Sequence, residues 1–333
     1  MIRLPPQKIG THDFTAEGTA MIEAEKLTKY YGTHPALVDV DFQIEKGEIV
    51  GFLGPNGAGK STTLRLLTGY FPPSRGTVRL AGFDIRTHPL EVRKRIGYLP
   101  ENVPLYKEMT VRSFLFFMAA LRGLNGKRKA ARVEEVLKDF MLHHQAETLI
   151  HKLSKGYRQL TGMAQAFVHE PEVLILDEPT LSIDPRQVVR VRERIKAYGR
   201  SHTVVLSSHI LPEVALICDR ILVMDQGRIV AADRPERLAA ALGGPSVYEM
   251  EVTGEEEAVR AAIEKVPEVL KIRCTGEGTE RRFVVEGRPG KDLREALSSA
   301  VTAAGFTLLG LTAKEMSLED IFLRLTRHKE DKS

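Results

Sequence analysis

A nine-residue stretch of the sequence has the composition of a loop that binds phosphate. It consists of Gly54, Pro55, Asn56, Gly57, Ala58, Gly59, Lys60, Ser61 and Thr62. Its three glycines lack a Cβ atom, so the backbone can approach an anion closely and turn successive N–H groups toward it. Lys60 would place a positive charge on the β- and γ-phosphates of a nucleotide, and the Ser61 hydroxyl would reach Mg²⁺, which prefers oxygen ligands.

The elements around this loop give the motif its meaning. The residues at 48–53 form a short apolar, β-branched run typical of a buried parallel strand, and 62–68 have helical spacing. A strand, a glycine-rich turn and a helix N-terminus in this order favour anion binding. A glycine-rich turn without a ligand is the alternative interpretation.

Two more strands are predicted to end in side chains that can do chemistry. Residues 173–176 are apolar and lead directly into the adjacent acids Asp177 and Glu178, and the run at 203–208 ends at His209. Ligands of open α/β sheets bind where parallel strands end. Because neighbouring side chains point in different directions, Asp177 can serve Mg²⁺ while Glu178 faces a reacting water.

Three further positions have both a functional and a purely structural interpretation. The predicted strand at 96–101 ends at the carboxylate of Glu101. Ser154 and Gly156 open a predicted helix, where they form either part of a ligand site or only a cap. Tyr31 lies in a predicted turn at 30–32, where its ring stacks on an adenine or packs on the protein's own core; the sequence leaves both open.

The 333 residues predict two domains. Residues 1–20 have no clear period and are expected to be a disordered extension. The motifs fall within a nucleotide-binding domain at 21–240, with a helical insertion at about 102–155. After the Gly-Gly-Pro stretch at 243–245 the pattern restarts as βαββαβ, which predicts a small accessory α+β domain at 245–327, with a helix at 319–326 near its end.

Composition limits the possible functions. A net charge of +4 and short basic runs favour solvated faces over a nucleic-acid surface, so no nucleic acid partner is expected. Two cysteines, Cys218 and Cys274, are too few for a disulfide framework, which suits a reducing cytoplasm. The longest strongly apolar run, at 114–121, is far too short for a bilayer core of about 30 Å, so the chain is not expected to span a membrane.

Taken together, these motifs resemble the ATP-binding subunits of ABC transporters over residues 21–238. The markers are Tyr31, the phosphate loop, Glu101 at the Q-loop position, the signature-like Leu153–Gly156, Asp177 and Glu178, the D-loop-like Ser182–Asp184, and His209 at the switch position. Two positions depart from the family pattern: Glu101 replaces a glutamine and Lys155 replaces a glycine. The motifs and the βαββαβ tail are similar to those of export subunits that are named for gliding motility, multidrug export or copper-related export.

The resemblance implies a fold, a reaction and partners. The fold is a P-loop NTPase of the ABC type, a mixed α/β sheet with a helical insertion, followed by the ferredoxin-like tail. The reaction is hydrolysis of ATP with Mg²⁺, driving a separate integral-membrane permease, so that the subunit is cytoplasmic and sits at the inner face of the cell membrane.

The resemblance also assigns roles to residues. Lys60, Glu178 and His209 are expected to be catalytic. Ser61, Asp177 and Glu101 would hold the metal. The phosphate loop, Tyr31, Glu101, Ser154, Gly156 and Asp184 would bind ATP, with the signature residues acting on the nucleotide of a second subunit in a homodimer or heterodimer.

Two alternatives stay open. One is a soluble ABC ATPase acting in translation or DNA repair, although such proteins usually carry two cassettes or a long coiled-coil insertion. The other is nucleotide binding for assembly alone, against which stands the intact set of Lys60, Asp177, Glu178 and His209.

Overall fold

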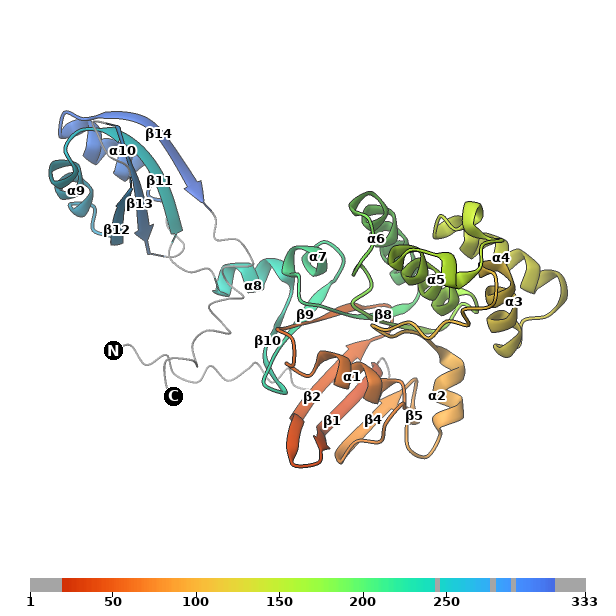
Figure 1. Cartoon of the computed structure of the whole chain (residues 1–333). Coiled ribbons are helices and arrows are strands. Elements are labelled where there is room, and N and C mark those ends of the chain that lie inside the picture. Colours follow the sequence, from red (N-terminus) through yellow and green to blue (C-terminus); the bar gives the residue numbers. More distant parts are fainter. Residues whose placement is uncertain (1–19, 243–245, 276–279, 289–291, 315–333) are drawn as a thin grey trace. The chain divides into compact units, whose positions relative to one another are not determined.

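The computed structural model describes residues 20–242, 246–275, 280–288 and 292–314 (Figure 1). The described residues fall into two compact units, which divide between Pro235 and Glu236. All of the predicted extension at 1–20 except Ala20 lies outside the described residues, and so does the helix predicted at 319–326.

The first unit contains a six-stranded sheet that carries the motifs. Its strands, in spatial order, are β10 (Arg228–Asp233), β9 (Arg220–Asp225), β3 (Ile49–Leu53), β8 (Thr203–Ser208), β7 (Val173–Asp177) and β6 (Ile96–Leu99). Neighbouring strands pair in parallel except β10, which forms an antiparallel hairpin with β9. Every residue of β3, β7 and β8 is buried. Burial on both faces explains why these strands read as nearly continuous apolar runs.

A second, antiparallel sheet covers part of the same core. Its strands, in spatial order, are β2 (His34–Glu45), β1 (Ala20–Tyr31), β4 (Arg75–Leu80) and β5 (Phe83–Asp84). Phe42 of β2 packs edge-to-face on Phe52 of β3, with ring centroids 5.3 Å apart. The prediction of a turn at 30–32 is wrong in its placement. Tyr31 still pairs with His34 across the hairpin, so the turn itself is Gly32–Thr33.

Helices connect the strands of the first unit. They are α1 (Lys60–Leu67), α2 (Pro89–Arg95), α3 (Val111–Leu121), α4 (Gly126–Asp139), α5 (Lys155–Phe167), α6 (Pro185–Gly199) and α7 (Leu211–Ala215), with 3-10 turns at His143–Gln145 and Ile150–Lys152. Helices α3, α4 and α5 lie together in the yellow-green part of Figure 1, between β6 and β7 in the sequence. Among the described helices, none is both long and apolar enough to cross a membrane.

The second unit has the predicted βαββαβ order. After α8 (Pro235–Leu242) come β11 (Ser246–Thr253), α9 (Glu256–Glu264), β12 (Val269–Thr275), β13 (Glu280–Gly287), α10 (Arg294–Ala303) and β14 (Thr307–Lys314). The antiparallel sheet has the order β12-β13-β11-β14. Its core contains Met250 and Phe283 from the sheet, Ile263 from α9 and Leu297 from α10. Both helices therefore cover one face, as in a split βαβ sandwich.

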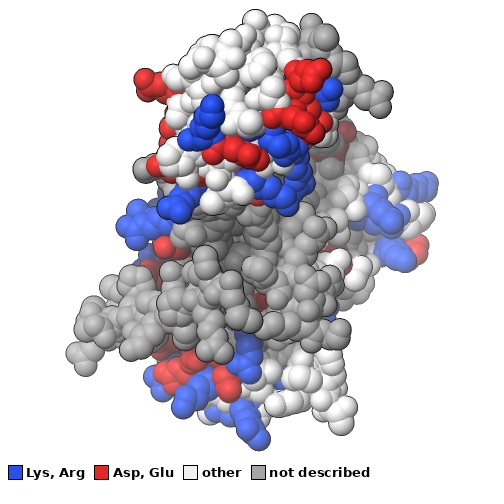
Figure 2. All heavy atoms as spheres, turned by 90° about the vertical axis from the view of Figure 1, so that its left-hand side faces the viewer, with Lys and Arg blue, Asp and Glu red and all other residues white. Residues whose placement is uncertain are grey.

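The opposite face of this small sheet carries paired charges. Arg282 of β13 bonds Glu251 of β11 at 2.5 Å, and Arg273 of β12 lies 3.2 Å from Glu286 of β13. Figure 2 shows one face of the molecule, on which the described basic and acidic side chains lie next to each other. Such mixing is typical of a solvated surface.

Candidate active site

The phosphate loop joins the end of β3 to the start of α1. Gly57 and Gly59 have φ values of 82° and 106°, which side chains of L-residues disfavour. A Cβ on Gly59 would also come within 2.6 Å of the Leu37 side chain and 2.9 Å of a backbone oxygen, so glycine is required there. In the described part of the chain no side chain caps α1, and the first turn of α1 has no acidic residue. The N–H groups of this turn are thus available to an anion.

Lys60 is held at the centre of the site. Its ammonium donates to the backbone oxygens of Gly54 at 2.7 Å and Pro55 at 3.2 Å, and lies 3.8 Å from Oε1 of Glu178. Burial lowers the pKa of Lys60, while the charges of Glu178, Asp177 and Glu101 act in the opposite direction. Glu101 itself lies beyond the end of β6, which is Leu99, and the Glu101 residue is exposed.

Asp177 ends β7 beside the phosphate loop. Its Oδ1 accepts hydrogen bonds from the hydroxyls of Ser61 at 3.0 Å and Ser207 at 2.6 Å. Its Oδ2 is buried and has no hydrogen-bond partner among the described residues. An unpaired carboxylate oxygen next to a serine hydroxyl and a phosphate loop is a donor set that fits Mg²⁺.

The described residues do not by themselves supply the ligand set of a complete metal site. Within the described residues, no group of three or more His, Cys, Asp or Glu side chains is placed to hold a metal ion. This fits Mg²⁺, which is commonly bound through one or two carboxylates together with substrate phosphates.

Glu178 places its carboxylate between two cationic or polar partners. Oε2 lies 3.0 Å from Nδ1 of His209, and Oε1 faces Lys60. The side chain of Glu178 is 10% exposed and that of His209 is 42% exposed, so the pair opens toward solvent at the histidine. A carboxylate in this position can orient and polarise a water molecule next to the phosphates.

The signature-like and D-loop-like residues lie close to each other in the first unit. Ser154 caps α5 by accepting a hydrogen bond from the Tyr157 N–H at 3.3 Å. A Cβ on Gly156 would come within 2.9 Å of the Ser182 oxygen. Asp184 caps α6 by accepting from the Arg186 N–H at 2.9 Å. For the described residues, no hydrogen bond or ion pair joins Ser154, Gly156 or Asp184 to the phosphate loop.

Tyr31 ends β1 on the surface. Its ring packs edge-to-face on Phe71 at 6.1 Å, and the ammonium of Lys29 lies 5.7 Å from its centroid. The residue is nevertheless 42% exposed. It has both a packing role and a free surface, and its stacking on adenine stays a prediction.

Two residues of the site were not singled out from the sequence. Ser207 is fully buried at the end of β8, and its hydroxyl accepts from the N–H of Glu178 at 3.0 Å. Gln159 of α5 donates to the backbone oxygen of Glu178 at 3.2 Å. A signal exists for Ser207, because Ser207 and Ser208 end an otherwise apolar strand. Gln159 gives no such signal, since polar residues are common in helices.

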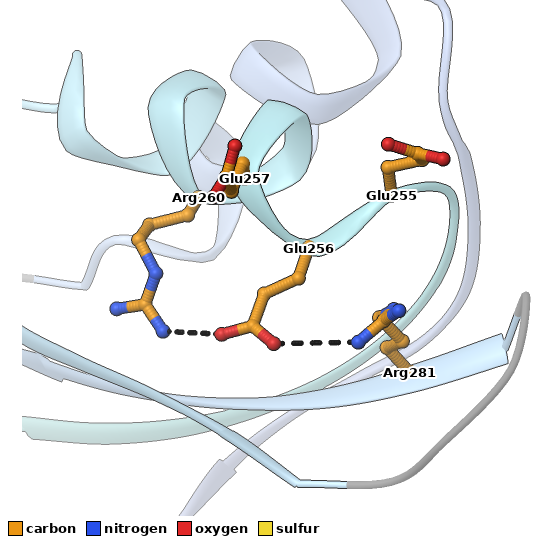
Figure 3. A pocket seen from close by; sticks show the side chains of 5 residues that line it. All are labelled: Glu255, Glu256, Glu257, Arg260 and Arg281. Atoms are coloured by element: carbon orange, nitrogen blue, oxygen red, sulfur yellow. Dashed lines mark hydrogen bonds and ion pairs between the residues drawn. The ribbon is translucent and has the colours of Figure 1, made fainter.

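A pocket of about 540 Å³ lies in the second unit, whereas all of these motifs belong to the first unit (Figure 3). Glu255, Glu256, Glu257, Arg260 and Arg281 line it. Glu256 bonds Arg260 at 2.8 Å and lies 3.3 Å from Arg281, so one carboxylate partners both guanidinium groups. The lining as a whole carries three carboxylates and two guanidinium groups, so it has no strong excess of either charge.

Comparison with known proteins decides the family. Residues 37–181 match the family model described as ABC transporter. The linearmycin resistance ATP-binding protein LnrL of Bacillus subtilis is 33% identical over 307 residues, covering 92% of this chain and 98% of that protein. The chain belongs to the ABC transporter ATP-binding proteins. A Nod factor export ATP-binding protein of Paraburkholderia xenovorans is also 33% identical, over 92% of this chain and 97% of its own length.

Solved structures of ABC ATPases share the fold of about two thirds of this chain. The ATP-binding subunit of an ABC transporter is 31% identical, with a TM-score of 0.62, and the match covers 66% of this chain and 91% of that one. The predicted ABC-type P-loop fold and the predicted family are therefore confirmed. As a member of this family, the chain is an ATPase subunit of a transporter; such subunits dimerise and pair with membrane permeases.

Proposed function

We propose that this subunit hydrolyses ATP in the presence of Mg²⁺ at the interface between two nucleotide-binding subunits, and that it powers export through a separate membrane permease. One observation carries the proposal: the Glu178 carboxylate is held between Lys60 and His209, beside the phosphate loop. A nucleotide bound for assembly alone would not need a carboxylate in this position.

Each residue of the site has a distinct task. The loop N–H groups and Lys60 hold the β- and γ-phosphates, and Glu178 orients the attacking water. The water oxygen bonds to the γ-phosphorus while the bond to the β,γ-bridging oxygen breaks and its electron pair leaves with ADP. One water proton passes toward Glu178 and on to the released phosphate. His209 contacts the γ-phosphate and stabilises the charge of the loose transition state.

The metal site would use residues from three elements. Ser61 of α1, Asp177 of β7 and Glu101 beyond β6 would hold Mg²⁺. The positive charge of the ion would offset the negative charge of the phosphate oxygens. The buried Oδ2 of Asp177, which has no protein partner among the described residues, supports this assignment. The hydrogen bond between Ser61 and Asp177 holds the Ser61 hydroxyl oxygen next to Oδ1 of Asp177.

A second subunit would complete each ATP site. Ser154 and Gly156 stand at the N-terminus of α5, which favours negative charge, and they would bind the γ-phosphate of the partner's nucleotide. Tyr31 would stack on the adenine of the chain's own nucleotide, and Asp184 would border the interface. ATP then joins the two subunits, and hydrolysis releases them.

The relatives suggest the direction of transport and the location. Their names refer to linearmycin resistance, Nod factor export and bacitracin transport. We infer export of a substrate for this chain as well, with the subunit peripheral at the inner face of the cell membrane through its permease.

Purification from native membranes tests this function. The tagged chain, extracted in mild detergent, is expected to bring down one polytopic membrane protein, and the complex is expected to release phosphate from ATP only when Mg²⁺ is present. The Glu178→Gln variant provides the control, with the membrane protein retained and phosphate release lost. Copurification with ribosomes or DNA, and no membrane protein, would contradict transport.

A further inference from the structure

We propose that Gln159 and Ser207 are positioning residues that hold the peptide of Glu178 from both sides, and that Gln159 thereby couples the signature helix to the catalytic carboxylate. This inference rests on the role of Glu178 in the proposed function. It concerns side chains that touch neither ATP nor the water, and that act through the Glu178 backbone.

The backbone of Glu178 needs such support. Its φ is 48°, a left-handed conformation that is disfavoured for a residue with a Cβ and persists only where surrounding contacts enforce it. Glu178 follows the last residue of β7, so the strand ladder no longer constrains it. The direction of its carboxylate depends on this conformation.

Ser207 fixes the amide side of the residue. Its hydroxyl accepts from the Glu178 N–H at 3.0 Å and donates to Oδ1 of Asp177 at 2.6 Å. A single buried oxygen thus joins the metal-facing acid to the water-facing acid. Because the residue is fully buried, water cannot replace the hydroxyl if it is removed.

Gln159 fixes the carbonyl side. Its Nε2 donates to the Glu178 oxygen at 3.2 Å, and the side chain is buried at 7% exposure. The same oxygen accepts from the Leu181 N–H at 3.2 Å, in the turn that leads to the D-loop-like segment. The carbonyl of Glu178 is therefore bound from the signature helix and from this turn together.

The position of Gln159 in α5 links its contact with Glu178 to the signature end of the helix. The helix begins at Lys155, after the cap Ser154, so Gln159 lies about one turn from the end that would meet the partner's nucleotide. A short helical segment moves as one body. Movement of the signature end on phosphate binding would therefore reach the Glu178 peptide, which serves the other ATP site of the dimer. The two sites of the dimer would be coupled through this hydrogen bond.

Steady-state ATPase kinetics of the full chain in its permease complex test the inference. Gln159→Met keeps the length of the side chain without a donor, and Ser207→Ala removes one oxygen atom. Both are expected to lower kcat at least about tenfold and to leave the KM for ATP within about twofold, because the phosphate loop is untouched. Gln159→Met is also expected to bring the Hill coefficient for ATP closer to one.

A matched control is available on the same helix. Thr161 is fully buried, and its hydroxyl donates to the Tyr157 backbone oxygen and not to Glu178. Thr161→Val removes a buried hydrogen bond of α5 and is expected to keep kcat and the Hill coefficient. Thermal unfolding of each variant reports whether it is folded. If Gln159→Met does not fold, Ser207→Ala still tests the positioning of Glu178.

The outcomes separate this inference from the proposed function. If Glu178→Gln abolishes turnover while folded Gln159→Met and Ser207→Ala turn over at the wild-type rate, the positioning role is wrong. If Glu178→Gln itself keeps the wild-type rate, the proposed role of Glu178 fails instead. A wild-type Hill coefficient of one, or a coefficient that Gln159→Met leaves unchanged, overturns the coupling between sites.

Discussion

Oε2 of Glu178 lies 3.0 Å from Nδ1 of His209, while the neighbouring acid Asp177 turns toward Ser61. Two adjacent carboxylates thus face different partners because they stand where β7 ends and the chain changes direction. One is available to a metal ion and the other to a water molecule. The chemistry of the site depends on this separation.

Glu178→Gln is expected to separate ATP binding from hydrolysis. The amide keeps the size of the side chain but is a poor proton acceptor, so turnover is expected to fall by about 100-fold or more while ATP affinity is kept. Phosphate release and binding of a fluorescent ATP analogue measure the two quantities. Gel filtration with ATP is expected to show a trapped dimer. Turnover near the wild-type rate would assign the water-orienting role to another residue.

Lys60→Ala is expected to weaken nucleotide binding by at least about tenfold, because the phosphates then face Glu178 and Asp177 without a compensating charge. Equilibrium binding of ATP measures the change. Lys94→Ala is the matched control: it removes the same charge from an exposed residue that pairs with Glu91. Equal affinities for the two variants would show that Lys60 does not contact the phosphates.

Glu101 is expected to set the requirement for Mg²⁺. The added charge of a glutamate strengthens its attraction for a hard cation, so Glu101→Gln should keep most of the activity but need more Mg²⁺ for half-maximal turnover. Glu101→Ala should lose metal retention and coupling to the permease. Mg²⁺ titrations of the ATPase rate at fixed ATP compare the three proteins. Superimposable curves would mean that Glu101 acts only as a hinge of the helical region.

His169 is expected to make stability depend on pH. Burial, with the charge of Arg122 next, lowers the pKa of His169 to about 4, and its ordinary pKa is about 6.5. Between these values the unfolded chain binds more protons than the folded one. The contribution of neutral His169 to the free energy of unfolding is therefore complete above about pH 6.5. This free energy falls by about 3 kcal/mol as the pH is lowered toward 4.

A substitution without a titrating group tests this expectation. His169 donates from Nε2 to the Ile96 oxygen at 3.1 Å, and glutamine in its place keeps an N–H donor. His169→Gln is expected to flatten the fall in unfolding free energy between pH 6.5 and 4.5, measured by urea denaturation. Equal pH slopes for both proteins would assign the dependence to other groups.

Truncation after residue 242 is expected to leave ATP binding intact. Every motif of the nucleotide site lies in the first compact unit, and β11 to β14 with α9 and α10 form their own core. Binding of ATP to the folded, truncated protein measures this. Full loss of binding would mean that the second unit supports the nucleotide site. Altered pairing of subunits in the truncated protein would agree with a regulatory role for that unit.

The sequence by itself determined the strands, the loop and the order of the motifs. Buried parallel strands are apolar throughout, so the runs that became β3, β7 and β8 could be recognised, as could the polar residues Asp177 and His209 near their ends. Glycine at positions with positive φ marked the phosphate loop. The apolar periodicity of the C-terminal segment predicted its βαββαβ order, because the period is set by the local backbone geometry of a strand or a helix.

The tertiary structure decided which atoms meet. Ser207 lies 30 residues from Asp177 and Gln159 lies 19 residues from Glu178, so no local pattern relates them. Their hydrogen bonds exist because β8 lies next to β7 and because α5 packs on β6, the other neighbour of β7. The end of β1 was also misjudged from sequence, since cross-strand pairing of Tyr31 with His34 extends the strand beyond its alternating part. Pairing across a sheet and packing of helices on it depend on distant residues, which periodicity and spacing do not encode.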